Sequence, residues 1–133
     1  MLLLLAPQNT NFMKNGRFYF KLTTNGNLLG EYSNDDCRCS YTEAANRILP
    51  SDEALPLLSG SNFPGHFVST WYEVRDKGSV TADLVIKPKQ SCLGIFTLVW
   101  KEIKNGATPN GKLFEGEAML CDETLIGNYW AAS

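Results

Sequence analysis

Hydrophobic and polar positions alternate over most of the second half of the chain. This period of two is typical of β-strands with one buried face. The clearest alternating sets are Val80, Ala82, Leu84 and Ile86; then Gly94, Phe96, Leu98 and Trp100; then Phe114, Gly116, Ala118 and Leu120. With the turn residues between them, these sets predict five consecutive strands. The predicted strands are 66–75, 79–87, 93–102, 112–121 and 124–131.

Two Asn-Gly pairs, Asn15-Gly16 and Asn25-Gly26, punctuate the first part of the chain. Asn-Gly favours a tight hairpin turn, because both central residues of a type I′ turn need positive φ. Between the two pairs, Phe18, Phe20 and Leu22 alternate with polar residues. We therefore predict a three-stranded meander with one apolar side. Its strands are expected at 10–14, 17–23 and 27–33.

Between the two groups of strands, the pattern favours one short helix. Ser40 and Glu43 have the spacing of a capping box, in which the Ser side chain caps the helix and the Glu side chain reaches back. Apolar residues follow at helical spacing until Pro50, which cannot continue a helix. We therefore predict a helix near 41–49, followed by a long connection over residues 50–65.

Three strands and five strands make eight, mostly joined to their sequence neighbours. An antiparallel sheet of this size usually closes, because closure removes exposed edges. Gly94, Gly116 and Gly127 lie inside strand patterns, where glycine permits the sharp coiling of a small barrel. The expected fold is therefore all-β, an eight-stranded antiparallel up-and-down barrel in one domain over residues 1–133. A two-sheet β-sandwich is the alternative.

Some of these strands resemble strands of the calycin superfamily, which contains the lipocalin, fatty-acid-binding and avidin-type barrels. Gly94-Ile-Phe-Thr-Leu-Val-Trp100 and Phe114-Glu-Gly-Glu-Ala118 look like two consecutive strands of an avidin-type barrel, and Gly26-Asn-Leu-Leu-Gly-Glu-Tyr32 looks like an earlier one. Ser69-Thr-Trp-Tyr-Glu73 is similar to the lipocalin Gly-x-Trp signature, with Ser69 in place of glycine and in mid-chain. The resemblance implies a barrel that holds a small, mostly apolar molecule at one open end. No biotin-binding or lipid-binding residue is carried over.

Composition and charge narrow the classes of partner. The chain has 133 residues, of which 44% are hydrophobic and 20% are charged, an ordinary globular balance. Its net charge of −2, with scattered basic residues, does not indicate a nucleic-acid partner. No apolar run approaches membrane-spanning length, and the start, Met-Leu-Leu-Leu-Leu-Ala, lacks the basic region of a signal peptide. We expect a cytoplasmic protein with no membrane partner.

The cysteines do not indicate a metal site or a cofactor site. Cys37 and Cys39 form a Cys-x-Cys pair, but the chain has one histidine and no second ligand pair at zinc-site spacing. Cys92 and Cys121 have no basic neighbour in sequence that would activate a thiol. The chain has no glycine-rich phosphate loop and no hydrolase or metalloprotease motif. We expect no metal and no cofactor.

Aromatic residues and two charged residues supply the candidate ligand-binding residues. Large flat side chains in strands can line a pocket or simply fill a barrel. An inward Arg or Glu could fix the orientation of a ligand, although such a group can equally lie at the rim or outside. The candidates are Trp71, Tyr72, Glu73, Arg75, Trp100 and Tyr129.

Three further titratable residues could carry catalysis if they face the lumen. His66 lies at a strand start, and we favour an exposed position over a catalytic one. Glu115 and Glu117 share one face of their strand. If Phe114 and Ala118 point inward, both glutamates point to solvent; if the strand is inverted, both line the interior, where a buried carboxylate would mark a site.

Three functions are open at this point. We expect a protein that binds a small, partly apolar ligand in the barrel lumen. The second possibility is an enzyme that uses an inward Glu, Tyr or Arg in the same barrel. The third is an interaction protein whose barrel is filled by its own side chains, with a possible homodimer. An open or filled lumen distinguishes the first two from the third.

Overall fold

Eight antiparallel strands form one closed barrel in the computed structural model of the chain. The structure describes residues 15–35, 37–48, 62–73, 78–103 and 111–132. The strands are β1 (Asn15–Leu22), β2 (Leu28–Asn34), β3 (Cys37–Arg47), β4 (Gly65–Glu73), β5 (Gly78–Pro88), β6 (Ile95–Glu102), β7 (Lys112–Cys121) and β8 (Thr124–Ala131). The fold class predicted from the sequence is confirmed, and the closure excludes the two-sheet sandwich.

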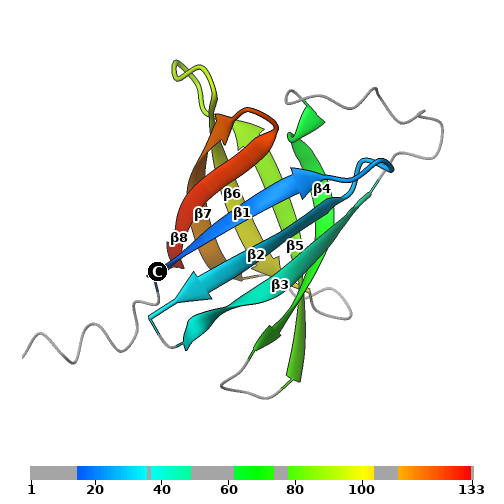
Figure 1. Ribbon diagram of the computed structural model, residues 1–133, viewed down its shortest axis with the longest axis vertical. Coiled ribbons are helices and arrows are strands. Elements are labelled where there is room, and N and C mark those ends of the chain that lie inside the picture. Colours follow the sequence, from blue (N-terminus) through cyan, green and yellow to red (C-terminus); the bar gives the residue numbers. More distant parts are fainter. Residues whose placement is uncertain (1–14, 36, 49–61, 74–77, 104–110, 133) are drawn as a thin grey trace, which may run out of the picture.

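Each strand pairs with its sequence neighbours, and pairing of β1 with β8 closes the barrel (Figure 1). Successive connections therefore fall at opposite ends. The β1–β2, β3–β4, β5–β6 and β7–β8 connections meet at one end, called here the β1–β2 end. The β2–β3, β4–β5 and β6–β7 connections meet at the other, called here the β2–β3 end.

The five strands predicted in the second half of the chain are confirmed, with small shifts at their ends. β4 to β8 occupy positions 65–73, 78–88, 95–102, 112–121 and 124–131. Gly94 lies in the β5–β6 turn with φ of 80°, so its predicted place inside a strand is wrong. Gly116 and Gly127 do lie inside β7 and β8.

The two Asn-Gly pairs have different outcomes. Asn25-Gly26 forms the β1–β2 turn, where Gly26 has φ of 81° and the Thr23 hydroxyl accepts the N–H of Asn27 at 3.1 Å. Asn15-Gly16 is not a turn, because both residues belong to β1 and Gly16 pairs with Asn34 and Tyr129. The strand predicted at 10–14 lies outside the described residues.

The helix predicted at 41–49 is wrong, because residues 37–47 form β3. Tyr41, Glu43 and Ala45 are partly or fully buried, while the residues between them are exposed. A run this short fits both a helical and a strand period, and its pairing partners decide between them. β3 pairs with β2 on one side and with β4 on the other, so its backbone groups are bonded on both edges. Those non-local bonds outweigh the local capping signal.

Apolar side chains fill the half of the barrel nearer the β1–β2 end. The largest fully buried apolar residues are Phe20, Leu28, Phe63, Phe67, Leu84, Ile86, Leu98 and Leu125. Phe63 comes from the β3–β4 connection and is fully buried in the same core cluster.

Arg47 ties the β1–β2 end together. Its guanidinium donates hydrogen bonds to the carbonyl oxygens of Gly26 at 2.9 Å, Pro64 at 3.0 Å and Asn62. The same group lies 4.5 Å from the centre of the Phe67 ring. One side chain therefore joins the β1–β2 turn to the residues that precede β4.

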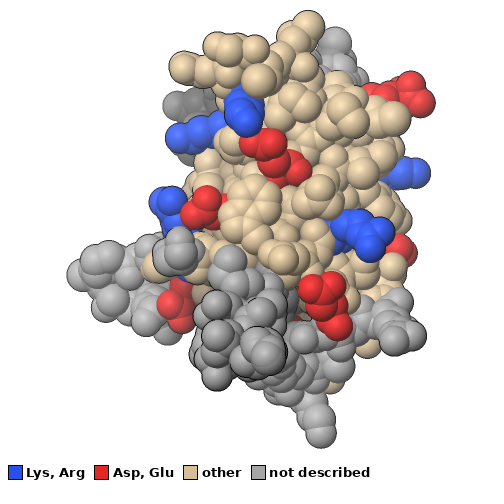
Figure 2. All heavy atoms as spheres, turned by 90° about the vertical axis from the view of Figure 1, so that its left-hand side faces the viewer, with Lys and Arg blue, Asp and Glu red and all other residues tan. Residues whose placement is uncertain are grey.

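The outer surface is mixed in charge. Figure 2 shows acidic and basic side chains intermingled with uncharged ones over the described part of one face. None of the described residues belongs to a helix that is long and apolar enough to cross a membrane.

Candidate functional site

A pocket opens at the β2–β3 end of the barrel, where the apolar filling stops. It is lined by side chains from six of the eight strands. They are Tyr32 and Asn34 of β2, Glu43 of β3, Trp71 and Glu73 of β4, Trp100 of β6, Phe114 of β7 and Tyr129 of β8. The lining combines five aromatic rings with two carboxyl groups and one amide.

The pocket is wide at its mouth and narrow within. Its empty space is about 320 Å³ when the open mouth is included, but the centre of a water-sized sphere can enter only about 20 Å³ of it. A water molecule needs roughly 10–15 Å³ by that measure. The inner part therefore has room for about one water, and anything larger has to occupy the mouth or a slot between rings.

Glu43 is the chemically distinctive residue of this pocket. It lies in the middle of β3, opposite Gly30 of β2 and Trp71 of β4. The alternation of β3 turns its side chain into the lumen, and only 5% of the residue is exposed. A carboxyl group in such a place is costly unless polar groups satisfy it.

Two neutral donors satisfy one oxygen of that carboxyl group. The Ser69 hydroxyl donates to Oε2 of Glu43 at 2.6 Å, and the Trp100 indole Nε1–H donates to the same oxygen at 2.8 Å. Neither donor binds Oε1. Ser69 is fully buried on β4 and Trp100 is almost fully buried on β6, so both donors are held in place by packing.

Burial raises the pKa of Glu43 from 4.5 to about 7. The cause is loss of hydration, which disfavours the charged carboxylate. The hydrogen bonds from Ser69 and Trp100 lower the pKa, because both stabilise the charged form, but their effect is the smaller one. Glu43 therefore exchanges a proton near neutral pH, where its charge can respond to a bound molecule.

A second carboxyl group, that of Glu73, lies nearer the mouth. The Trp71 indole Nε1–H donates to its Oε2 at 3.1 Å. Across the mouth, Nδ2 of Asn34 donates to the Tyr129 hydroxyl at 2.9 Å. The two indole N–H groups of the pocket are thus each directed at a carboxylate.

The aromatic rings form the walls by packing edge against face. The Phe114 and Tyr129 ring centres lie 5.4 Å apart at 89°, and the Trp71 and Phe114 ring centres lie 6.2 Å apart at 68°. Trp100 contacts Tyr129 at 6.2 Å between ring centres. Such contacts are favourable beyond their buried area, so they hold the walls in a defined shape.

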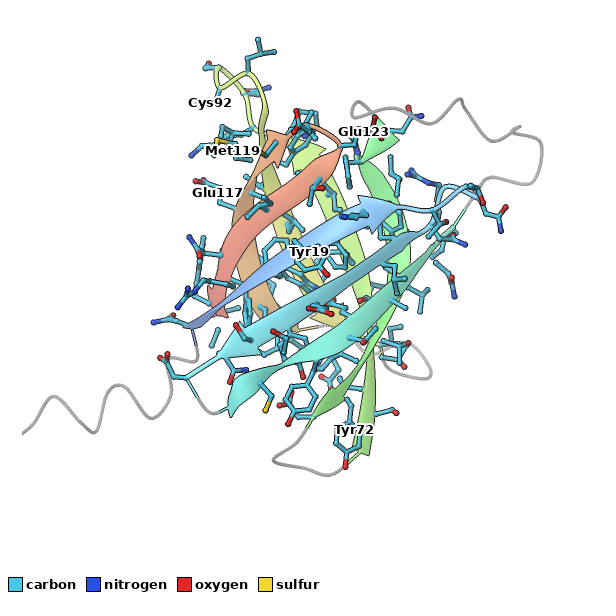
Figure 3. The ribbon with its side chains drawn as sticks, viewed as in Figure 1. Tyr19, Tyr72, Cys92, Glu117, Met119 and Glu123 are labelled. Atoms are coloured by element: carbon cyan, nitrogen blue, oxygen red, sulfur yellow. The ribbon has the colours of Figure 1, made fainter. Side chains whose placement is uncertain are left out.

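The structure brings four of the six predicted ligand-binding residues to this pocket: Trp71, Glu73, Trp100 and Tyr129. Tyr72 lies on the outer face of β4, where it is 46% exposed, and Figure 3 shows it at the outside of the lower end of the strand. Arg75 lies outside the described residues. Alternation along β4 explains the split, because Trp71 and Glu73 face the lumen and Tyr72 faces away.

The other three candidates lie outside the pocket. His66 is on the outer face of β4, with its Nε2 at 3.2 Å from Oδ1 of Asp83. Glu115 and Glu117 point away from the lumen on β7, while Gly116 and Ala118 are buried. Glu117 pairs with Lys89 at 2.6 Å, and Figure 3 shows it on the outside of the barrel. The inward-facing alternative for this strand is wrong.

Glu43 itself was missed by the sequence analysis, which placed it in a helix cap. The signal that could have found it is the alternation of Tyr41, Glu43 and Ala45 with exposed residues. Ser69 could have been identified from the sequence, because it shares a strand face with Phe67 and Trp71. Tyr32, Asn34 and Phe114 lie on predicted strands, but strand prediction does not show which ends meet at a pocket.

Larger hollows exist on the outer surface but lack comparable chemistry. One of them, open to water-sized spheres over about 440 Å³, lies beside β1, β2 and β8, and its charged groups are the exposed Arg17, Lys21 and Glu31. No group of three or more His, Cys, Asp or Glu residues within the described ranges could hold a metal ion. Buried polar chemistry in the described barrel is concentrated around Glu43.

Comparisons with protein-family models, with curated proteins and with solved structures found no match to this chain. What the pocket can do is therefore inferred from its own residues.

Proposed function

We propose that this chain is a calycin-like barrel that binds a small, partly apolar molecule at its β2–β3 end. The observation that supports this proposal is the buried carboxyl group of Glu43 in an aromatic pocket. An apolar side chain at this position would fill the barrel without the desolvation cost of a carboxyl group. Groups with such a desolvation cost are found mainly where they bind a ligand or take part in catalysis. A buried carboxyl group with a raised pKa in a pocket therefore favours a binding role.

The shape of the pocket limits the ligand. The body of the ligand would occupy the open mouth of the pocket, between the rings of Trp71, Phe114 and Tyr129. One polar group of the ligand would reach inward to Glu43. The narrow inner part excludes a bulky inner substituent. A small or flat molecule with one polar end fits these limits.

Three tryptophans provide a direct test of the binding site. Trp71 and Trp100 line the pocket, while Trp130 is exposed on the outer side of β8. In a two-dimensional ¹⁵N–¹H NMR screen of small aromatic compounds, binding at the pocket would shift the indole N–H signals of Trp71 and Trp100. The Trp130 signal is the internal control. Compounds that shift only Trp130, or a screen with no response at Trp71 and Trp100, would contradict the proposal.

The pKa of Glu43 favours an enzyme as the second candidate. A general acid or base works best when its pKa lies near the working pH, and that of Glu43 is about 7. Any turnover of a bound compound would then disappear in Glu43→Gln and persist in Glu117→Gln, whose parent residue lies outside the pocket. Turnover that survives Glu43→Gln would exclude this role.

We also propose that the barrel functions as a homodimer in the reducing environment of the cytoplasm. Met119 of β7 and Ile126 of β8 lie opposite each other on the outer face and are 55% and 47% exposed. Cys92 and Cys121 are exposed and form no disulfide, which suits a reducing compartment. Light scattering of the parent and of Met119→Lys tests the dimer: a parent of monomer mass contradicts it.

A further inference from the structure

The polar groups of the pocket are unusual in their balance of charge. The described lining contains the two carboxyl groups of Glu43 and Glu73 and no Lys, Arg or His. The donors that reach the buried Glu43 are neutral, namely the Ser69 hydroxyl and the Trp100 indole N–H. A carboxylate held only by neutral donors in a buried site lacks the opposite charge that usually accompanies it.

The donors next to Glu43 are already engaged with one of its two oxygens. The indole N–H of Trp100 and the hydroxyl of Ser69 both point at Oε2 of Glu43, and neither binds Oε1. An ionised carboxylate has about four acceptor positions on its two oxygens. The chemistry that remains at Glu43 is therefore acceptance of hydrogen bonds, and a matching ligand has to donate them.

The walls select for the same kind of molecule. The faces of Trp and Tyr rings attract cations, because the ring quadrupole is negative over the face. Trp71, Trp100 and Tyr129 surround the approach to the carboxyl group. The narrow inner space also favours a planar donor over a bulky tetrahedral one.

From the buried Glu43 carboxyl, the neutral donors around it and the aromatic walls, we infer that the ligand is a small flat organic cation that donates N–H groups, of the amidinium class. This inference rests on the proposed binding function. Its N–H groups would bind Glu43, its charge would complement the carboxylate of Glu43, and its ring would lie between the aromatic side chains of the mouth.

Binding of such a cation is coupled to the charge of Glu43. The other titratable groups that line the pocket are Glu73 of β4, Tyr32 of β2 and Tyr129 of β8. A cation binds the carboxylate better than the neutral acid, so affinity rises as Glu43 loses its proton. With a pKa of about 7 for Glu43, the fall in affinity between about pH 8 and about pH 6 is about tenfold. A neutral ligand that accepts a hydrogen bond from the acid would show the opposite trend.

Three probes of similar shape and different charge test the inference. Benzamidine is a cation, benzamide is neutral and benzoate is an anion at these pH values. Each is titrated into the parent chain with the Trp71 and Trp100 indole signals as reporters and Trp130 as the control. We expect benzamidine to bind at least about tenfold more tightly than benzamide near pH 8, with benzoate weakest. We also expect the roughly tenfold loss near pH 6 for benzamidine alone.

Two variants assign the preference to the buried carboxyl. Glu43→Gln keeps the shape of the side chain and should remove both the preference for benzamidine and its pH dependence. Glu117→Gln removes an exposed glutamate on β7 and should leave both unchanged. The probe series is measured on the parent chain, so it tests the preference for a cation even if a variant is unstable.

The outcomes separate this inference from the binding function. If benzamide or benzoate shifts Trp71 and Trp100 at equal or lower concentrations than benzamidine, the cation preference is wrong and the binding function stands. If none of the three shifts these signals, the cation inference is overturned. The broader compound screen then decides whether the pocket binds other chemistry.

Discussion

The indole N–H of Trp100 and the carboxyl group of Glu43 are joined across the lumen by a hydrogen bond of 2.8 Å. They belong to β6 and β3, which are not paired with each other, so the bond crosses the interior instead of following the sheet. It links the aromatic wall of the pocket to its buried acid. The protonation of Glu43 is therefore sensitive to a ring that also contacts Phe18 and Tyr129.

Substitution of Trp100 by phenylalanine should raise the pKa of Glu43 further above its ordinary value. The indole N–H stabilises the charged carboxylate, so its loss favours the protonated form. The carboxyl ¹³C signal of Glu43, followed through a pH titration by NMR, measures the change. Trp71→Phe is the matched control, because the Trp71 N–H bonds to Glu73 instead. Equal shifts in the two variants would show that ring packing, and not the hydrogen bond, sets this pKa.

Glu43→Gln should make the protein more stable at high pH and change the pH dependence of unfolding. The folded pKa of Glu43 is raised to about 7 from 4.5, so the folded state binds the proton more tightly than the unfolded state. The contribution of Glu43 to the stability of the folded state is therefore greatest below about pH 4.5 and falls until the pH passes about 7. The full loss is on the order of 3 kcal/mol.

Urea unfolding at a series of pH values measures this effect. The Gln variant should match the parent near pH 4.5 and exceed its unfolding free energy above pH 7. Glu117→Gln, at an exposed site, should follow the pH profile of the parent. A parent whose stability rises between these pH values, relative to the Gln variant, would contradict the raised pKa.

The sequence was sufficient to predict the strands whose alternation is strict. In β5 and β6 the inward residues are uniformly apolar, as at Leu84 and Leu98, so the period of two is visible without the structure. The barrel was predicted from a count of eight strands, although that count included a strand at 10–14, which lies outside the described residues, and lacked β3. Both inferences use local information, which the chain carries in each segment.

The candidate site was harder to predict, because its key strand is defined by distant partners. The segment around Glu43 carries a capping pattern that favours a helix locally, whereas pairing with Gly30 of β2 and Trp71 of β4 makes it a strand. The inward direction of Glu43 depends on that register. Local reasoning could identify Trp71, Trp100 and Tyr129 as possible pocket residues, but it could not show that they surround a carboxyl group from β3.

Gly30 should tolerate no side chain, because β1 and β2 approach closely there. A Cβ at this position would lie 1.7 Å from the carbonyl oxygen of Tyr19, which is part of the β1 backbone. Gly30→Ala has to separate the two strands, and we expect a loss of about 3 kcal/mol or more. Gly111→Ala is the control, since a Cβ there meets no atom within 4 Å. Thermal unfolding of both variants is the measurement, and similar melting temperatures would contradict the close approach.

Arg47→Lys should destabilise the barrel by about 2 kcal/mol, although it preserves the positive charge. The guanidinium reaches three carbonyl oxygens, those of Gly26, Pro64 and Asn62, from one planar group. A lysine ammonium is a single point charge on a flexible chain. It cannot bind all three carbonyl oxygens in this geometry, and it also loses the flat contact with Phe67.

Arg17→Lys is the control. It lies at an exposed position on β1 and should change the unfolding free energy by about 0.5 kcal/mol or less. Urea unfolding of the two variants against the parent tests the difference. Equal stability of Arg47→Lys and Arg17→Lys would mean that charge alone matters at position 47, and the β1–β2 end would then owe its closure to apolar packing around Phe63 and Phe67.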